Sequence, residues 1–294
     1  MKMKVRKAVI PAAGMGTRFL PATKAQPKEM LALVDKPIIQ YGVEEALAAG
    51  CDEVIIVTSR GKQSIEDHFD VSCELEKVLE DRGKIELLHM VRQIADMVHI
   101  AYVRQKEALG LGHAVLTARE LVGSEPFAVL LPDDVIDANV PCLKQMIEVF
   151  EETQTSVIAT QMVEGDAISA YGVLDVKPTD GRFRGKLFEI KNMIEKPALK
   201  DAPSNLAIIG RYILTPAIFE SISQTQRGSG GEIQLTDGIK LLLKKEKVYA
   251  YVFEGKRHDA GDKLGFLKAT VEFALKRADL GEPLRQHLKT LDLG

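Results

Sequence analysis

A glycine-rich, cationic segment near the amino terminus gives the clearest chemical signal in the sequence. Residues 11–30 read PAAGMGTRFLPATKAQPKEM and follow a short apolar run. Gly14 and Gly16 have no side chains, so backbone N–H groups there can approach a phosphate closely. Between residues 11 and 36, four cations stand against two carboxylates: Arg18, Lys24, Lys28 and Lys36 against Glu29 and Asp35. The whole chain is net negative, with 39 Lys and Arg against 42 Asp and Glu. The segment is therefore predicted to be a local cationic site.

Other phosphate-binding loops have different patterns. The dinucleotide-binding pattern G-x-G-x-x-G requires a third glycine where this chain has Phe19, and the pattern G-x-x-x-x-G-K-[ST] is absent. An NAD-dependent oxidoreductase also needs a ribose-binding acid after the second strand, where the chain has Thr58-Ser59-Arg60. For the loop alone, an ordinary turn with solvated lysines remains the alternative to phosphate binding.

Two carboxylates are candidates for metal binding. Asp133 ends an apolar run, and Mg²⁺ prefers one or two carboxylates together with phosphate oxygens and water. Asp259, within HDAGD, is the weaker second candidate, and a simple turn is the alternative reading there. A helix N-cap or a turn explains Asp134 as well as a functional role does. The six histidines have no HxxxH or HxH spacing, so we expect solvated or core roles for them.

The elements that must position these groups are predicted from an alternation of β-branched runs and amphipathic stretches. In the first half, this alternation predicts strands at 7–10, 53–59, 99–105 and 126–134, and helices at 37–50, 64–69, 73–96 and 112–123. The order predicts a Rossmann-like, mostly parallel sheet covered by helices on both faces. Ligands bind beyond the carboxyl ends of such strands. The glycine-rich loop, the loop after Gln105 and the pair Asp133-Asp134 all fall at those ends.

The second half of the chain is richer in strands. Its pattern predicts strands at 155–163, 171–178, 186–197, 205–214 and 248–255, and helices at 233–245, 263–280 and 284–291. Asp, Gly and Pro separate the strands, which favours an antiparallel or mixed extension of the same sheet. The fold class is therefore α/β, with one continuous sheet shared by two lobes.

Length and composition narrow the function classes. A chain of 294 residues suggests about two lobes or one large α/β domain. The chain lacks the excess of basic residues that is typical of nucleic-acid binding. It also has no run of about 20 apolar residues that could cross a membrane. Cys51, Cys73 and Cys142 form no CxxC pair and are expected to be reduced, buried thiols. We therefore expect a soluble, cytoplasmic protein without nucleic-acid or membrane partners.

The combination GxGTR and PK after a first strand resembles the sugar-nucleotidyltransferase family. The longer pattern AGMGTRFLPATKAQPKEM, at residues 13–30, is similar to that of the bacterial uridylyltransferases of this family that act on glucose 1-phosphate. The further matching segments follow the family's order over nearly the whole chain: VDKPIIQY, HFD (68–70), RQKEALGLGHAV (104–115), LPDD (131–134), YGV (171–173), EKP (195–197), PSNLAIIGRYIL (203–214), GGEIQLTD (230–237) and HDAGDKLG (258–265). Gln26 departs from the apolar residue expected in the loop.

The resemblance implies the nucleotide-diphospho-sugar transferase fold and a reaction. UTP and α-D-glucose 1-phosphate would give UDP-glucose and pyrophosphate with Mg²⁺ as cofactor. It also implies a nucleotide- and metal-binding half at 1–135, a strand-rich, sugar-phosphate-binding half at 136–256 and a helical segment at 257–294. A homodimer or homotetramer is expected, and Leu284, Leu288 and Leu291 form a stripe suited to such a contact. Packing within the chain is the alternative for that stripe.

The resemblance also implies roles for individual residues. The nucleotide-binding set is Ala12, Ala13, Gly14, Gly16, Thr17, Arg18, Lys28, Glu29, Gln105 and Gly110. The sugar-phosphate set is Gly172, Glu195, Lys196 and Asn205, and the metal ligands are Asp133 and Asp259. Arg18, Lys28, Asp133 and Lys196 are the expected catalytic residues. The amide of Gln105 can both donate to and accept from a uracil edge.

Two alternatives to this activity remain open. A thymidylyltransferase that acts on dTTP has a similar fold, although PKEM in place of PKPM favours the uridylyl member. A non-catalytic protein that binds nucleotide sugars is the other, and intact Lys28, Asp133 and Lys196 argue against it. Tolerance for dTTP or galactose 1-phosphate is not fixed by the sequence, and neither is the pathway that UDP-glucose would feed.

Overall fold

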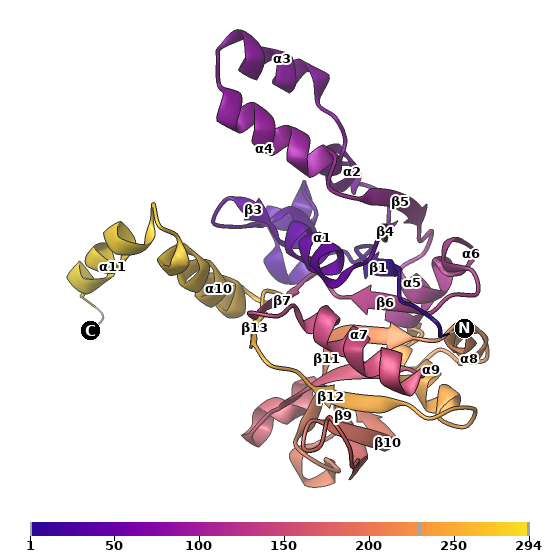
Figure 1. Cartoon of the computed structure of the whole chain (residues 1–294). Helices are drawn as coiled ribbons and strands as arrows, with labels where there is room; N and C mark the ends of the chain where they lie inside the picture. Colours follow the sequence, from indigo (N-terminus) through magenta and orange to yellow (C-terminus); the bar gives the residue numbers. More distant parts are fainter. Residues whose placement is uncertain (1, 229–230, 293–294) are drawn as a thin grey trace.

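A nine-stranded mixed sheet forms the centre of the molecule and confirms the predicted α/β class (Figure 1). The computed structural model describes residues 2–228 and 231–292, so Gly230, the first residue of the predicted motif at 230–237, lies outside it. The strand order is β5-β4-β1-β6-β11-β8-β12-β10-β9. The sheet is continuous across both halves of the chain, as the sequence predicts.

Four parallel strands make up one side of the sheet. They are β5 (His99–Arg104), β4 (Glu53–Thr58), β1 (Lys7–Pro11) and β6 (Phe127–Leu130). Successive side chains of a strand point to opposite faces, so Ala8 and Ile10 pack into one core cluster and Val9 into another. Both faces of this part of the sheet are therefore buried, which is why its strands are apolar almost throughout.

Helices cover the two faces. The helices on the face of Ala8 and Ile10 are α1 (Ile38–Ala49), α2 (Gln63–Phe69) and α7 (Cys142–Thr153). Those on the face of Val9 are α5 (Leu111–Thr117), α6 (Arg119–Val122), α8 (Ala217–Ser223) and α9 (Leu235–Leu242). Helix α1 ends where Gly50 adopts φ 100°, a left-handed conformation that glycine adopts without strain.

The second half extends the sheet, with mixed strand directions as expected. Its strands are β8 (Val157–Met162), β9 (Gly172–Pro178), β10 (Leu187–Glu195), β11 (Leu206–Leu214) and β12 (Tyr249–Val252). Strand β11 runs antiparallel to β6 and to β8, while β12 runs parallel to β8. In the β9–β10 pair, Glu195 lies opposite Gly172.

Two small sheets and several 3₁₀ turns were not predicted. Strands β7 (Asp134–Asp137) and β13 (Lys256–Asp259) pair antiparallel, with Asp134 opposite Asp259, and β2 (Ala32–Leu33) pairs with β3 (Lys36–Pro37). The 3₁₀ turns are η1 (Thr17–Phe19), η2 (Ala22–Lys24), η3 (Lys28–Met30), η4 (Gly165–Ala170) and η5 (Leu199–Asp201). The β7–β13 pair brings the carboxyl end of β6 beside the HDAGD segment.

Several predicted elements are corrected. The strand expected at 126–134 ends at Leu130, since the chain turns before β7. The helix expected at 73–96 is two helices, α3 (Cys73–Asp81) and α4 (Ile85–Ala95), because Gly83 with φ 65° breaks it. The stretch 112–123 is likewise divided into α5 and α6, and α7 and α8 were not predicted. Cys51 and Cys142 are buried as expected, but Cys73 on α3 is exposed.

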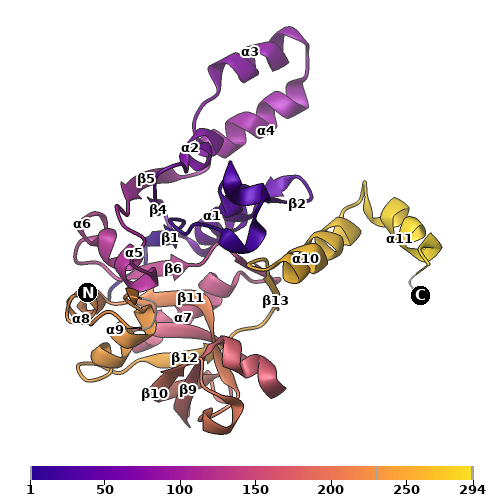
Figure 2. The ribbon, with the colours of Figure 1, turned by 180° about the vertical axis from the view of Figure 1, so that it is seen from behind.

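Two pairs of consecutive helices project from this body in both views (Figures 1 and 2). One consists of α3 and α4, and the other of α10 (Lys263–Lys276) and α11 (Gly281–Thr290). On α11, Leu284 and Leu288 are half-buried, and Leu291 just beyond it is exposed. No helix in the described ranges combines the length and apolar character needed to cross a membrane.

Candidate active site

A cavity of about 500 Å³ opens at the carboxyl ends of the parallel strands, where the sequence places the ligand. The predicted site residues that line it are Ala13, Gly14, Gly16, Thr17, Lys28, Glu29, Gln105, Gly110 and Asp133. They come from the loops after β1, β5 and β6. The structure therefore brings three separate sequence motifs to one cavity.

Two residues of the predicted nucleotide set lie elsewhere. Ala12 is fully buried, and its backbone N–H donates to the carbonyl of Val57 on β4 at 2.8 Å, so it supports the loop from below. Arg18 is exposed in η1, and its guanidinium donates to the carbonyl of Gly261 at 3.5 Å. That contact places Arg18 on the side of the cavity that carries the HDAGD segment.

The glycine-rich loop is fixed by a close approach at Gly16. This residue has φ 66°, and the hydroxyl of Thr23 donates to its carbonyl at 2.7 Å. A Cβ at Gly16 would lie 3.2 Å from the Cβ of Lys28. The glycine thus lets the loop pack against the segment that carries the main cation of the site.

Lys28 and Asp133 form an ion pair at the cavity, with Nζ and Oδ2 2.5 Å apart. About a quarter of each side chain is exposed. Burial disfavours the charged form of Lys28, but the carboxylates of Asp133 and Glu29 together raise its pKa. Burial likewise disfavours the charged form of Asp133, but Lys28 lowers its pKa below the usual range. Both groups are therefore ionised at neutral pH, a cation and an anion beside the same ligand space.

Glu29 forms a second ion pair, almost completely buried, with Lys62 at the start of α2. Lys62 Nζ donates to Glu29 Oε2 at 2.6 Å, and the side chains are 7% and 1% exposed. Burial raises the pKa of Glu29, and Lys62 and Lys28 only partly oppose the shift. The other carboxylate oxygen, Oε1, is buried and has no hydrogen-bond partner in the part of the chain that the structure describes, although Glu29 lines the cavity. Lys62 was not among the residues predicted from the sequence.

This pair makes a prediction about stability. Glu29→Gln should lower the free energy of unfolding by about 3 kcal/mol, because the Lys62 ammonium stays buried without a counter-charge. Glu29→Gln/Lys62→Met should recover most of that loss, since no buried charge remains. Urea unfolding without nucleotide, followed by circular dichroism, measures both. A double variant as unstable as the single one would show that the ion pair is not the cause.

Asp133 and Asp259 border one small space, which Gly261 leaves open. A Cβ on Gly261 would lie 3.0 Å from Asp259 Oδ1 and 3.1 Å from Asp133 Oδ2. The backbone N–H of Gly261 donates to Asp259 Oδ1 at 2.9 Å, and that of Ala260 donates to the carbonyl of Asp133 at 2.7 Å. Within residues 2–228 and 231–292, no group of three or more His, Cys, Asp or Glu could hold a metal. Two carboxylates that border the same space nonetheless suit a hard divalent cation.

Asp134, the neighbour of Asp133, is occupied by structural contacts. Its carboxylate is buried, accepts the backbone N–H of Gly210 at 2.9 Å and pairs with the guanidinium of Arg257. Burial raises the pKa of Asp134, although Arg257 opposes the shift. Arg257 also donates to Asp259 Oδ2 at 3.0 Å and to the hydroxyl of Tyr171 at 2.9 Å. One guanidinium therefore joins the two acidic segments to the start of β9.

The predicted sugar-binding residues lie at the adjacent ends of β9 and β10. A Cβ on Gly172 would lie 3.2 Å from Glu195 Oε2, and the hydroxyl of Thr236 donates to the same oxygen at 2.7 Å. Lys196 is exposed, has the unusual φ of 46° for a non-glycine residue, and its backbone N–H donates to the carbonyl of Tyr171. Asn205 is exposed just before β11. None of these four predicted residues lines the 500 Å³ cavity itself.

The segment before and into α9 connects the cavity to Glu195. Ile233 donates its N–H to the carbonyl of Leu109 at 2.7 Å and accepts the N–H of Gly112 at 2.9 Å. Gly110 has φ 92°, and a Cβ there would lie 2.8 Å from the Cβ of Glu232, so only glycine fits. Sequence reasoning gave no role to Glu232, Ile233 or Thr236, although they belong to the recognised segment GGEIQLTD.

Comparisons with known proteins agree with this geometry. Residues 7–275 match the family described as "Nucleotidyl transferase". A protein of Staphylococcus epidermidis named UTP–glucose-1-phosphate uridylyltransferase is 53% identical over 290 residues, which is 99% of each chain. A crystal structure described as UDP-glucose pyrophosphorylase complexed with UDP-glucose is 46% identical and covers 93% of this chain and 100% of its own, with a TM-score of 0.84. The UTP-bound UGPase from Acinetobacter baumannii is 40% identical over 98% of this chain and 100% of its own, with a TM-score of 0.90.

Proposed function

The chain belongs to the nucleotidyl transferase family, and from this premise we propose that it transfers the uridylyl group of UTP to α-D-glucose 1-phosphate, giving UDP-glucose and pyrophosphate. One observation carries the proposal. The cavity that holds Lys28, Asp133 and Gln105 is linked by the Ile233–Thr236 segment to Glu195, the candidate sugar ligand, and Arg257 joins Asp259 to Tyr171 at the start of β9. A nucleotide and a sugar phosphate can therefore lie with their phosphates facing each other.

The chemistry is an in-line displacement at phosphorus. A phosphate oxygen of glucose 1-phosphate attacks the α-phosphorus of UTP, the new P–O bond forms, and the bond to pyrophosphate breaks with its electron pair. The second pKa of a phosphate monoester is about 6, so the nucleophile is largely ionised at neutral pH and needs no general base. The difficulty is to bring two polyanions together, so positioning and charge stabilisation dominate.

Different residues in and around the cavity would take different parts in this reaction. Backbone N–H groups at Gly14 and Gly16 would approach the triphosphate, and Arg18 and Lys28 would neutralise it. Lys28 is held by Asp133 and packed under Gly16, so its charge is in place before the substrate arrives. Gln105 and the backbone near Ala13 and Gly110 would contact the uracil.

A divalent cation fits the space that Asp133 and Asp259 border at Gly261, and we propose Mg²⁺. Bound there, Mg²⁺ would supply positive charge to the phosphate oxygens during the displacement. Asp133 would hold it through its carboxylate, which Lys28 keeps ionised. Arg257 would orient Asp259 through its contact with Oδ2.

On the sugar side, Glu195 would accept hydrogen bonds from glucose hydroxyls through the oxygen that Thr236 does not use. Gly172 would let the sugar approach that carboxylate, since a Cβ at this position would lie 3.2 Å from Glu195 Oε2. Lys196 would hold the sugar phosphate, and the left-handed backbone conformation fixes where its side chain begins. Asn205 is a further polar candidate.

Assembly and location complete the proposal. We infer a homodimer or homotetramer, with residues 257–294 as the contact segment, because α10 and α11 project from the body, α11 carries Leu284 and Leu288, and Leu291 follows it. Leu264 and Leu267 on α10 are also more than half exposed. The three cysteines are free, which fits a cytoplasmic location.

Release of pyrophosphate from UTP and glucose 1-phosphate tests the proposed reaction. We expect release only when both substrates and Mg²⁺ are present, and excess EDTA should abolish it. Parallel assays with dTTP separate a thymidylyltransferase, and galactose 1-phosphate measures sugar tolerance. Binding of UDP-glucose without any turnover would instead indicate a non-catalytic binding protein.

A further inference from the structure

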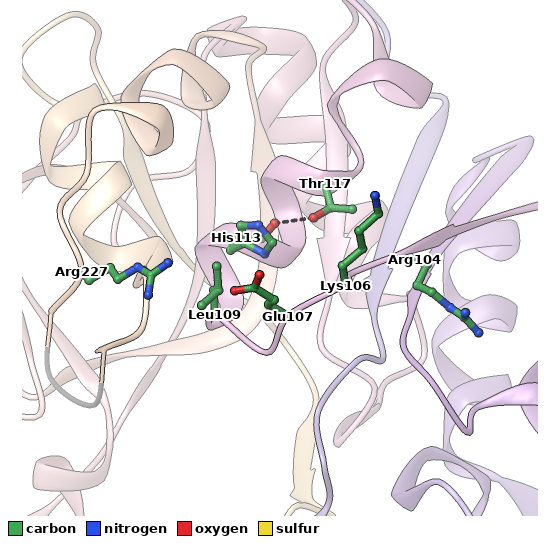
Figure 3. Close-up of a pocket in the computed structure, with 7 residues that line it drawn as sticks. All are labelled: Arg104, Lys106, Glu107, Leu109, His113, Thr117 and Arg227. Atoms are coloured by element: carbon green, nitrogen blue, oxygen red, sulfur yellow. Dashed lines mark hydrogen bonds between the residues drawn. The ribbon is translucent and has the colours of Figure 1, made fainter.

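A second cavity, of about 420 Å³, shares its wall with the first. Residues of the segment 104–113 line the two cavities in turn: Gln105 and Gly110 line the first, while Lys106, Leu109 and His113 line the second. Figure 3 shows His113 between Arg227 on one side and Lys106 on the other. His113 is half-buried, and it is not part of the nucleotide cavity. One of its ring nitrogens nevertheless reaches Gln105.

The contacts of Gln105 fix which way its amide points. Its Nε2 donates to the carbonyl of Gly110 at 3.2 Å and lies 2.8 Å from Nδ1 of His113. A carbonyl oxygen can only accept, so the nitrogen of the amide, and not its oxygen, must face Gly110. Both N–H groups of the amide are then used within the protein, one by Gly110 and one by His113.

This arrangement determines the state of the imidazole and of the amide oxygen. Because Nε2 of Gln105 donates, Nδ1 of His113 must accept, so the imidazole is neutral and carries its proton on its own Nε2. Oε1 of Gln105 has no hydrogen-bond partner among the described residues, although the side chain is only 5% exposed and lines the nucleotide cavity. The buried amide thus offers a ligand an acceptor and no donor.

We propose that His113 is a positioning residue that makes the nucleotide site selective for pyrimidines carrying a proton on N3, which rests on the proposed function. Uracil has an N3–H donor between two carbonyl groups, and Oε1 of Gln105 can accept it. In cytosine, N3 is itself an acceptor and would face Oε1 without a proton between them. A buried polar group left unpaired in this way costs binding free energy, so CTP is rejected.

His113 opposes a rotation of the Gln105 side-chain amide by half a turn. Gly110 alone holds one N–H through the longer of the two contacts, 3.2 Å against 2.8 Å. Without an acceptor at position 113, only the contact with Gly110 opposes a half-turn of the amide, so the orientation that presents its N–H₂ to the cavity costs less free energy. That orientation would donate to N3 of cytosine and would lose the acceptor for uracil.

Steady-state kinetics on two variants tests this role. His113→Leu removes the acceptor, and His113→Asn restores one, because its Oδ1 lies near the former position of Nδ1. Pyrophosphate release is measured with UTP or CTP at saturating glucose 1-phosphate. In His113→Leu we expect the ratio of kcat/KM for UTP to that for CTP to fall about tenfold, mainly through KM for UTP. His113→Asn should stay within about threefold of the native ratio, and KM for glucose 1-phosphate should not change.

A double-mutant cycle with Gln105→Leu separates this mechanism from a general structural effect. In the Gln105→Leu background, the further change His113→Leu should leave the UTP to CTP ratio as it is. Equal losses with both nucleotides in His113→Leu, or additive effects in the cycle, would overturn the proposal.

Calorimetric binding of UDP and CDP gives a readout that does not depend on turnover. Native protein that binds UDP but releases no pyrophosphate would contradict the proposed function alone. In that case the ratio of UDP to CDP affinity, compared between native protein and His113→Leu, still tests His113. Equal affinity of the native protein for UDP and CDP would overturn the inference itself.

Discussion

Asp133→Ala is expected to lower kcat by at least about 10²-fold while the protein remains folded. Asp133 is the one carboxylate of the site that both lines the cavity and borders the space at Gly261. Its loss would remove the main ligand for Mg²⁺ and the anion that keeps Lys28 in place. Both effects act where charge builds on the leaving pyrophosphate, so they appear in kcat. Pyrophosphate release at saturating substrates, with Mg²⁺ varied, measures the change.

Asp52→Ala is the matched control for this experiment. Asp52 forms an exposed ion pair with Arg6 beside the amino end of β4, away from the cavity, and its removal should leave kcat within about twofold. Circular dichroism of both variants checks the fold. If Asp133→Ala retains near-native turnover in Mg²⁺, Asp133 is not the metal ligand and the assignment of the cavity fails.

Glu195→Ala and Lys196→Ala are expected to act on different kinetic constants. Glu195→Ala removes acceptors for sugar hydroxyls, so KM for glucose 1-phosphate should rise at least about tenfold while KM for UTP changes little. Selectivity between glucose and galactose 1-phosphates should relax as well. Lys196→Ala should lower kcat, by about 10²-fold, because in the proposed function its charge would face the reacting phosphates and matter most in the transition state.

The same strand offers a matched control pair. Glu189 and Lys191 on β10 form a partly exposed ion pair, so their alanine variants should change neither KM nor kcat appreciably. Steady-state rates are measured with each substrate varied in turn. Equal weakening of both substrates in Glu195→Ala, or an unchanged Lys196→Ala, would mean that the EKP segment is a surface turn and that the sugar binds elsewhere.

The predicted residues that line the nucleotide cavity share one property: they belong to segments that leave the carboxyl ends of parallel strands. Lys28, Gln105 and Asp133 lie in or just after loops that leave β1, β5 and β6, and parallel strands bring their carboxyl ends to one edge. Alternating apolar runs were enough to locate those strands. The mixed extension was also predicted, because turn residues separate its strands clearly.

The residues that the sequence did not reveal act through contacts between distant segments. Lys62 meets Glu29 from α2, and Thr236 meets Glu195 from α9, and neither pairing leaves a local pattern. His113 and Gln105 both belong to the recognised segment 104–115. Their contact could not be predicted, because it forms only when the loop between them folds back. Helix α7 was missed although its buried residues Leu143, Met146 and Val149 recur at helical spacing, so its pattern was available in the sequence. Helix α8 has only seven residues, too few for a clear helical periodicity.

The position of β11 between β6 and β8 has a consequence for the newborn chain. Strand β6 is synthesised about eighty residues before β11, and all four of its residues are buried in the finished sheet. Until residues 206–214 leave the ribosome, that strand presents an unpaired apolar edge, a feature that invites association with other chains. Fragments that end between β6 and β11 should therefore aggregate when expressed. The nascent chain should depend on chaperones most strongly during that interval of translation.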